Sequence, residues 1–170
     1  MGGLKKFVNG IDRMSEWCGR LFSWLLVALV GLCIFEVITR RVFGHPTIWT
    51  FEVLSYVFCA TVMLTMGYVL HHKGHVHIDI FTAHLSPKWQ AILEVITFIF
   101  FLGFFTIVFL WKGSIYAGMS WMRLERSPSA FNFYVFPAKT LIPVGALLLL
   151  LQGIADAVRN VVFVIKGERL

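Results

Sequence analysis

Long apolar runs alternate with short polar breaks along the whole chain. A helix needs about 20 residues, at about 1.5 Å of rise each, to cross roughly 30 Å of hydrocarbon. Each of the four apolar runs reaches that length once its flanking residues are included. The pattern therefore predicts four tilted transmembrane helices, over about residues 21–43, 50–72, 91–122 and 138–165.

The residues before the first apolar run have a helical periodicity of their own. Charged side chains occupy one arc, and apolar side chains recur at intervals of four and three on the other, at Phe7, Ile11, Met14, Cys18 and Leu21. This pattern predicts a short amphipathic helix over about residues 4–20 that lies in the headgroup plane. The alternative is a plain cytoplasmic extension of the first span, since Gly10 and Gly19 weaken the helix.

Composition supports the membrane assignment. Hydrophobic residues make up 58% of the 170 residues and charged residues only 14%, which leaves too little polar surface to cover a soluble domain. The first apolar run also lacks a small-residue cleavage pattern, so we expect it to be retained as a helix. The sequence predicts an all-α membrane protein with a single membrane domain over residues 1–170.

The basic residues indicate the orientation, because cytoplasmic segments carry an excess of lysine and arginine. Assigning the polar breaks alternately to two sides puts nine basic residues on the side of the termini and five on the other, with Lys112 inside the third span. Both termini are therefore expected in the cytoplasm. The net charge of +6 is spread over the breaks rather than along one stripe. This favours anionic lipid headgroups over nucleic acid as the counter-charge.

No arrangement typical of an enzyme or a cofactor carrier occurs in the sequence. Cys18, Cys33 and Cys59 are isolated from one another, which argues against a disulfide framework, a zinc site and a thiol oxidase. The first, third and fourth predicted spans lack histidine, which argues against a haem carrier. We expect no catalytic residue, no cofactor and no bound metal.

The stretch "VLHHKGHVHID", residues 69–79, holds four histidines directly after the second apolar run. A metal site needs ligands that converge at a fixed geometry, and a flexible loop does not supply that convergence. We therefore interpret the segment as a wet, partly basic turn on the cytoplasmic side.

Glu36 is the most informative acidic residue because it lies toward the far end of the first span, where a carboxylate needs a partner or water. Arg40 follows four residues later on the same helix face, which predicts an ion pair that anchors the helix end. A similar pair is expected between Asp156 and Arg159 in the last turns of the fourth span. The alternative is a self-sufficient small four-helix exporter that uses Glu36 for cation coupling.

Three segments, taken in order, resemble a known family, the small DctQ-type membrane subunit of tripartite ATP-independent periplasmic (TRAP) transporters. The segments are "EVITRRVFGHPTIWTFEV", "HHKGHVHIDIF" and "ERSPSAFNFYVFPAKTLIPVGALLLLLQ". The resemblance spans nearly the whole chain. The positions that match the family pattern are Arg40, Arg41, Phe43, Pro46, Trp49, Glu52, His77, Ile78, Asp79, Ser127, Pro128, Pro143 and Gly145.

This resemblance implies a non-catalytic subunit in a bacterial inner membrane. Its partners would be a large sodium-coupled elevator subunit, a periplasmic substrate-binding protein and membrane lipids, in a complex that takes up an organic acid such as a sialic acid or a dicarboxylate. The residues expected to contact a partner or to anchor the helices are Glu36, Arg40, Arg41, Trp49, Glu52, His77, Asp79, Arg123, Arg126, Pro143 and Gly145.

Overall fold

The computed structural model describes residues 2–72, 86–129 and 131–166, so the candidate residues His77 and Asp79 lie outside the described residues. The elements are α1 (Gly2–Phe22), α2 (Trp24–Val42), α3 (Thr50–His71), α5 (Pro87–Thr97), the π-helix η1 (Phe98–Gly103), α6 (Phe104–Met122) and α7 (Phe136–Lys166).

Four helical stretches of the described chain are long and apolar enough to cross a membrane. These are Gly3–Val42, Thr50–His71, Pro87–Met122 and Phe136–Ile165. The predicted all-α fold with four membrane-length helices is therefore confirmed. Because α7 has 31 residues, it is about 46 Å long and exceeds the thickness of the hydrocarbon layer.

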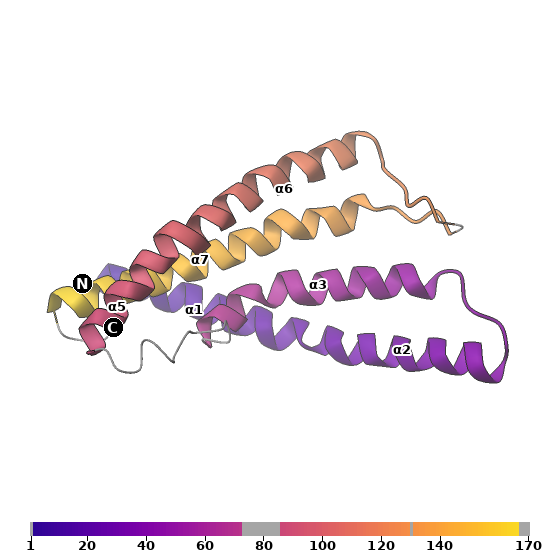
Figure 1. The fold of residues 1–170 in the computed structure, drawn as a ribbon, viewed down its shortest axis with the longest axis horizontal. Helices are drawn as coiled ribbons and strands as arrows, with labels where there is room; N and C mark the ends of the chain where they lie inside the picture. Colours follow the sequence, from indigo (N-terminus) through magenta and orange to yellow (C-terminus); the bar gives the residue numbers. More distant parts are fainter. Residues whose placement is uncertain (1, 73–85, 130, 167–170) are drawn as a thin grey trace.

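The four long helices form an open row rather than a closed bundle. Their order is α2, α3, α7, α6, in which α3 packs on α7, α2 packs on α3, and α6 packs on α7 (Figure 1). Within the described residues, the two outer helices share no substantial contact with each other. No residue of α2 is buried, so the row presents broad apolar surfaces to its surroundings.

The N-terminal helix is long, and the prediction of a short one is wrong. It has 21 residues, and only Ser23 separates it from α2. The backbone of Ser23 itself has right-handed helical angles, and its amide donates to the Gly19 carbonyl at 2.9 Å. Neither Gly10 nor Gly19 breaks the helix, because tertiary packing outweighs their weak intrinsic preference.

Only part of the predicted apolar face of α1 is buried within the chain. Val8, Ile11 and Cys18 are buried, whereas Phe7 is 53% exposed and Leu21 is 46% exposed. Val8 and Ile11 form a buried hydrophobic cluster together with Ala155 of α7. As a result α1 has two apolar faces: one packs on α3 and α7, and the other faces outward.

Two glycines allow α3 and α7 to approach each other closely. A Cβ at Gly67 would lie 3.2 Å from the Leu148 carbonyl oxygen, and a Cβ at Gly145 would lie 2.6 Å from the Met63 carbonyl oxygen. Small residues let helix backbones approach and gain van der Waals contact where lipid supplies no hydrophobic driving force. The candidate residue Gly145 therefore serves the contact between helices of this chain.

The contact of α6 with α7 follows the same principle. A Cβ at Gly113 would lie 2.9 Å from Ile142 Cγ2 and 3.6 Å from the ring of Pro143. Pro143 lies inside α7, where it removes one backbone hydrogen bond and needs space for its ring. Gly113 provides that space, so the candidate residue Pro143 also takes part in packing within the chain.

The third membrane-length helix contains a π-helical segment, η1. A Cβ at Gly103 would lie 2.8 Å from the Phe98 carbonyl oxygen, so a larger residue would not fit this wide turn. The Phe98 ring in turn covers Gly153 of α7, where a Cβ would lie 2.1 Å from it. The π-helical segment thus places an aromatic ring against a glycine of the neighbouring helix.

We predict that Gly145→Ala destabilises the folded chain by about 1–3 kcal/mol, because the added methyl group overpacks the contact of α3 with α7. Gly118→Ala is the matched control, since no atom lies within 4 Å of the added Cβ. Thermal unfolding of both variants in detergent tests this. Equal unfolding temperatures for the two variants would refute it.

Candidate functional site

Polar side chains gather at the two ends of the helical row. We call the connections 43–49 and 123–135 the hairpin end. We call α1, the last turn of α3 and the last four turns of α7 the terminal end. The two ends lie on opposite sides of the molecule (Figure 1).

Glu36 is held by two residues near the hairpin end. Its carboxylate accepts a hydrogen bond from Arg40 at 3.1 Å and another from the Thr47 hydroxyl, which also contacts the Thr50 hydroxyl. The predicted Glu36–Arg40 ion pair is therefore confirmed. The threonines were not predicted, because their approach depends on how the 43–49 connection folds back. Among the other candidates here, Arg41 is exposed, and the Trp49 ring lies 6.0 Å from that of Phe35.

Glu52 connects α3 to the 123–135 connection. Its side chain is 7% exposed and accepts a hydrogen bond from the Ser129 hydroxyl. One turn further along α3, the Tyr56 ring lies 5.6 Å from the Phe133 ring. A buried carboxylate is costly without hydrogen-bond donors. Glu52 therefore fastens this connection to the neighbouring helix pair.

A second ion pair braces the same connection from the other side. Lys139 Nζ lies 2.6 Å from Glu125 Oε2 and 4.0 Å from the centre of the Tyr116 ring. The backbone closes the connection through Val135 N, which donates to the Glu125 carbonyl at 2.9 Å. The hydrogen-bonded ammonium of Lys139 holds the pKa of the Glu125 carboxyl below its ordinary value of 4.5.

The candidate arginines belong to this braced connection. Arg123 is exposed, and Arg126 donates to the Tyr134 hydroxyl at 2.5 Å while lying 4.3 Å from the centre of that ring. Two residues take left-handed backbone angles, Leu124 with φ 45° and Asn132 with φ 54°. The described residues of the 123–135 connection are thus held against the neighbouring helices and carry basic and aromatic side chains on their surface. We call this connection the knob.

A buried polar junction joins α1, α3 and α7 at the terminal end. Gln152 is fully buried on α7 and accepts from the Ser15 hydroxyl at 2.7 Å. Its amide nitrogen donates to Asp12 Oδ1 at 3.0 Å and lies 3.2 Å from His71 Nδ1. Arg159 donates to Asp12 Oδ2 at 2.5 Å and to Asp156 at 2.8 Å, so the predicted pairing of Asp156 with Arg159 is also confirmed.

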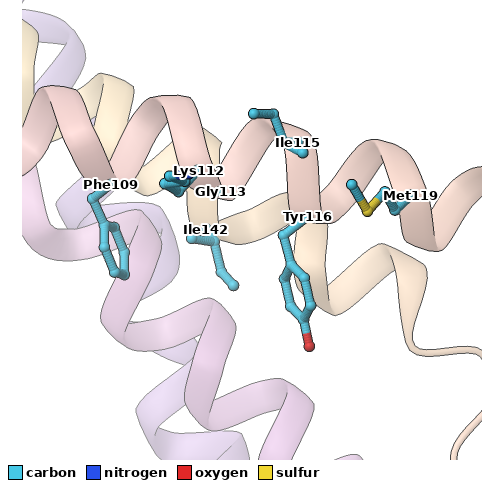
Figure 2. Close-up of a pocket in the computed structure, with 7 residues that line it drawn as sticks. All are labelled: Phe109, Lys112, Gly113, Ile115, Tyr116, Met119 and Ile142. Carbon is cyan, nitrogen blue, oxygen red and sulfur yellow. The ribbon is translucent and has the colours of Figure 1, made fainter.

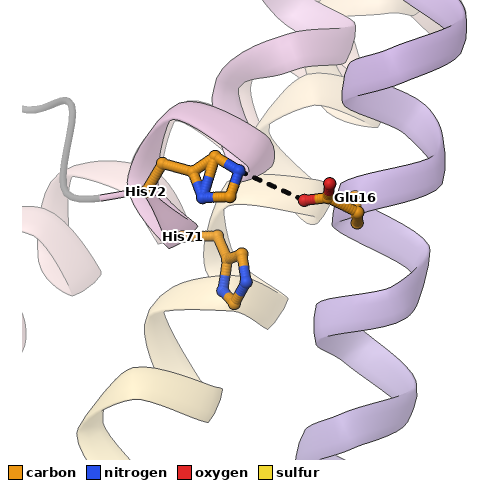
Figure 3. A group of neighbouring side chains, drawn as sticks. All are labelled: Glu16, His71 and His72. Carbon is orange, nitrogen blue, oxygen red and sulfur yellow. Dashed lines mark ion pairs between the residues drawn. The ribbon is translucent and has the colours of Figure 1, made fainter.

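Two of the four clustered histidines lie within the described residues. His71 is the last residue of α3 and His72 is its C-cap, so both lie at the end of the predicted span 50–72, and the rest of the predicted turn lies outside the described residues. His71 Nδ1 lies 3.3 Å from Asp12 Oδ1, and His72 Nε2 lies 3.2 Å from Glu16 Oε2 (Figure 3). α1 brings these carboxylates to the end of α3, a tertiary contact that the histidine spacing does not reveal.

These histidines and carboxylates are also the described residues with donor atoms close enough for a metal ion. The donor atoms of two sets lie within 4.8 Å of one another: Glu16, His71 and His72, and Asp12, His71 and Asp156. In each set one carboxylate already forms an ion pair with an arginine. Arg20 lies 2.7 Å from Glu16, and Arg159 lies 2.5 Å from Asp12. Hydrogen bonding accounts for the arrangement without an ion.

An apolar groove of about 420 Å³ lies along α6 and α7. Phe109, Tyr116 and Ile142 point to the same side (Figure 2), and Lys112 stands at the edge, 5.1 Å from the centre of the Trp111 ring. Aliphatic and aromatic side chains line almost all of it. Such a surface suits an apolar neighbour, a lipid chain or another helix, rather than a polar solute.

The sequence matches the family described as "Tripartite ATP-independent periplasmic transporters, DctQ component" over residues 29–163. The chain belongs to the DctQ family. The predicted resemblance is thereby confirmed, and with the four membrane-length helices it makes the chain a multi-pass membrane component of a TRAP transporter.

A stretch of 78 residues of this DctQ-family chain is also 32% identical to the "Sialic acid TRAP transporter permease protein SiaT" of Haemophilus influenzae. The stretch covers 46% of this chain and 12% of that relative. The relative is therefore several times longer than this chain. The polar knob at the hairpin end and most of the terminal junction lie within residues 29–163, whereas Asp12, Ser15 and Glu16 precede them.

We predict that Glu125→Gln lowers the unfolding temperature of this DctQ-family protein above pH 4.5, and that the difference disappears as the pH falls below the lowered pKa of Glu125. The pKa of Glu125 is lowered in the folded chain. Its stabilising contribution is therefore present above the ordinary value and is lost as the pH falls through the folded value. Thermal unfolding from pH 3 to pH 7 measures this. Lys139→Gln should reproduce the loss at neutral pH, and a pH-independent difference would contradict the prediction.

Proposed function

We propose that the chain is the non-catalytic small membrane subunit of a TRAP transporter. Its role is to hold a large, sodium-coupled elevator subunit in the bacterial inner membrane while that subunit takes up an organic acid. The observation that carries this proposal is the open row of helices in a member of the DctQ family. The row leaves large apolar surfaces uncovered, and charged side chains form ion pairs with one another at each of its two ends.

The architecture suits a scaffold better than a carrier. A carrier needs a polar solute site inside its helices near the middle of the membrane. Here α2 and α6 lie at opposite edges of the row, so the described helices enclose no common interior. A large moving subunit must push against a part that resists displacement, and several anchored helices in a broad row supply that resistance.

The self-sufficient exporter is the less favoured function. Its proposed coupling residue, Glu36, has its carboxylate occupied by Arg40 and the Thr47 hydroxyl at the hairpin end. A cation-coupling carboxylate has to exchange partners during transport. The local contacts of Glu36 instead fix the end of α2 next to the start of α3.

The relative in Haemophilus influenzae supports the choice of partner and substrate. Its name assigns it to sialic acid transport, and the similar stretch is 12% of its length. A region resembling this chain is thus covalently part of a much longer permease in that protein. If this chain takes the place that the similar region has in the longer permease, it lies beside a separate large subunit. We propose a sialic acid or another carboxylate, such as a dicarboxylate, as the substrate class.

In the proposed orientation the terminal end faces the cytoplasm and the hairpin end faces the periplasm. The excess of basic residues on the side of the termini supports this orientation. The braced knob with Arg123 and Arg126 would then face a periplasmic substrate-binding protein. Fixed charges on a rigid surface steer association and select the partner more than they add affinity.

We predict that this chain co-purifies with a large TRAP membrane subunit of the same cell, and that its deletion abolishes or strongly reduces organic acid uptake by cells. The physical reason is that the large subunit loses its anchored neighbour. Co-expression with a tag on one subunit, together with uptake of labelled sialic acid and of a labelled dicarboxylate, tests it. Full uptake by the large subunit alone would overturn the scaffold role.

We predict that Arg123→Glu lowers uptake about fivefold at limiting binding protein, the equivalent of about 1 kcal/mol for one exposed charge contact. Assembly of the two membrane subunits should not change. Lys88→Glu is the matched control, because this exposed lysine carries the same charge change at the start of α5, on the opposite side. Equal uptake by the two variants would contradict periplasmic docking at the knob.

A further inference from the structure

We propose that the apolar groove along α6 and α7 receives a transmembrane helix of the large subunit, and that a carboxylate on this helix pairs with Lys112. The inference rests on the proposed function, because it names the surface of this chain on which that partner lies.

One flank of α6 carries large side chains at the spacing of a helix-packing contact. They recur at intervals of four, three, four and three residues, at Phe105, Phe109, Lys112, Tyr116 and Met119, and we call these five residues the α6 seam. The four apolar members are at least 36% exposed, and the rings of Phe105 and Phe109 stack with 5.5 Å between their centres. Apolar side chains that repeat every three to four residues are the pattern by which one helix packs along another.

α6 meets α7 of its own chain through a different flank, which consists of small residues. The buried residues of α6 are Thr106, Gly113, Ala117 and Ser120. Small residues let two helix backbones approach closely. The α6 seam lies beside this contact and stays largely exposed, so it is available to a neighbour.

The groove at the centre of the seam is already shaped in this chain alone. Ile142 of α7 lies against Gly113, where a Cβ would come within 2.9 Å of its Cγ2, and Tyr116 points to the same side as Ile142 (Figure 2). The Tyr116 ring is held by Lys139, whose Nζ lies 4.0 Å from the ring centre. A preformed groove of about 420 Å³ spares a partner much of the cost of ordering the surface that it binds.

Lys112 is the charged member of the seam, and it forms no ion pair within the described part of the chain. Its ammonium lies 5.1 Å from the centre of the exposed Trp111 ring. At the opposite edge of the row, by contrast, Glu36 is paired with Arg40. A lysine within a membrane-spanning segment is costly without an anion or water. Lys112 therefore calls for an anion from another molecule.

The position of Lys112 along α6 favours a helix carboxylate over a lipid phosphate as that anion. From Lys112 to Met122, the last residue of α6, the helix rises about 15 Å. A lysine side chain is shorter than this, so its ammonium does not extend to the level of the knob, where the polar surface of this side begins. An acyl chain fills apolar space but brings no anion to this depth. A helix with an aspartate or a glutamate fills the groove and supplies the charge-assisted hydrogen bond.

Site-specific photo-cross-linking in the assembled transporter tests the location. The photoreactive residue p-benzoylphenylalanine replaces Phe105 or Met119 in the full chain, which is co-expressed with a large TRAP membrane subunit of the same cell and irradiated in native membranes. The matched control replaces Val30, which is 50% exposed on α2 at the other edge of the row. We expect cross-links to the large subunit from Phe105 and Met119, and lipid adducts alone from Val30.

Replacement of Lys112 tests the charge. Lys112→Met keeps an unbranched side chain but removes the ammonium, which leaves the partner's carboxylate unpaired, whereas Lys112→Arg keeps the charge. In titrations of the purified subunits in detergent, Lys112→Met should weaken association at least about thirtyfold, and Lys112→Arg should bind nearly as the wild type does. Lys88→Met, which removes an exposed lysine at the start of α5, is the matched control and should have no effect.

A double variant separates loss of the ion pair from misfolding. The carboxylate nearest the cross-link in the large subunit is replaced by its amide, in combination with Lys112→Met. This combination should recover most of the lost association, because neither charge is then left unpaired in the membrane. The unfolding temperature of the Lys112→Met chain alone should equal that of the wild type.

Three results would overturn the inference while the wild-type chain still co-purifies with the large subunit, so that the proposed function stands. The first is cross-linking to the large subunit from Val30 and not from the seam. The second is lipid adducts alone from Phe105 and Met119, which would show that acyl chains fill the groove. The third is equal association of Lys112→Met and Lys88→Met. Failure of the wild type to co-purify would instead refute the proposed function and the inference with it.

Discussion

The close approach of α3 to α7 is the contact on which the rest of the structure depends. Gly67 and Gly145 allow the two backbones to meet with no side chain between them. Inside a bilayer, apolar side chains gain little from leaving lipid, so this kind of surface-to-surface packing holds helices together. The other long helices are added to the outside of this pair, α2 on α3 and α6 on α7.

This order of packing explains why the row remains open. A closed bundle would cover the apolar sides of all four helices, whereas here α2 buries no residue and the groove beside α6 is lined by Phe109, Tyr116 and Ile142. Lipid or a partner subunit has to cover these surfaces in the cell. A subunit that supports a larger neighbour needs such uncovered surface, and a subunit that encloses its own substrate does not.

The polar residues do a different task at each end. At the hairpin end, Glu52 and the Lys139–Glu125 pair fix the 123–135 connection to the helices. At the terminal end, Gln152 and the charged groups around it join three helices through hydrogen bonds, two of which involve titratable rings. The first arrangement fixes a connection between two helices, and the second joins three helices directly.

The sequence by itself determined the number of membrane-length helices, the family, and the local pairs Glu36–Arg40 and Asp156–Arg159. Each of these depends on residues close together in the chain, through the length of an apolar run or the spacing of one helical turn. Only the tertiary structure decided which apolar residues of α1 are buried, that α1 is long, and that His71 and His72 meet Asp12 and Glu16. Those features come from contacts between residues more than fifty positions apart. Both apolar faces of α1 have helical periodicity. Periodicity therefore carries no information about which neighbour a face will meet.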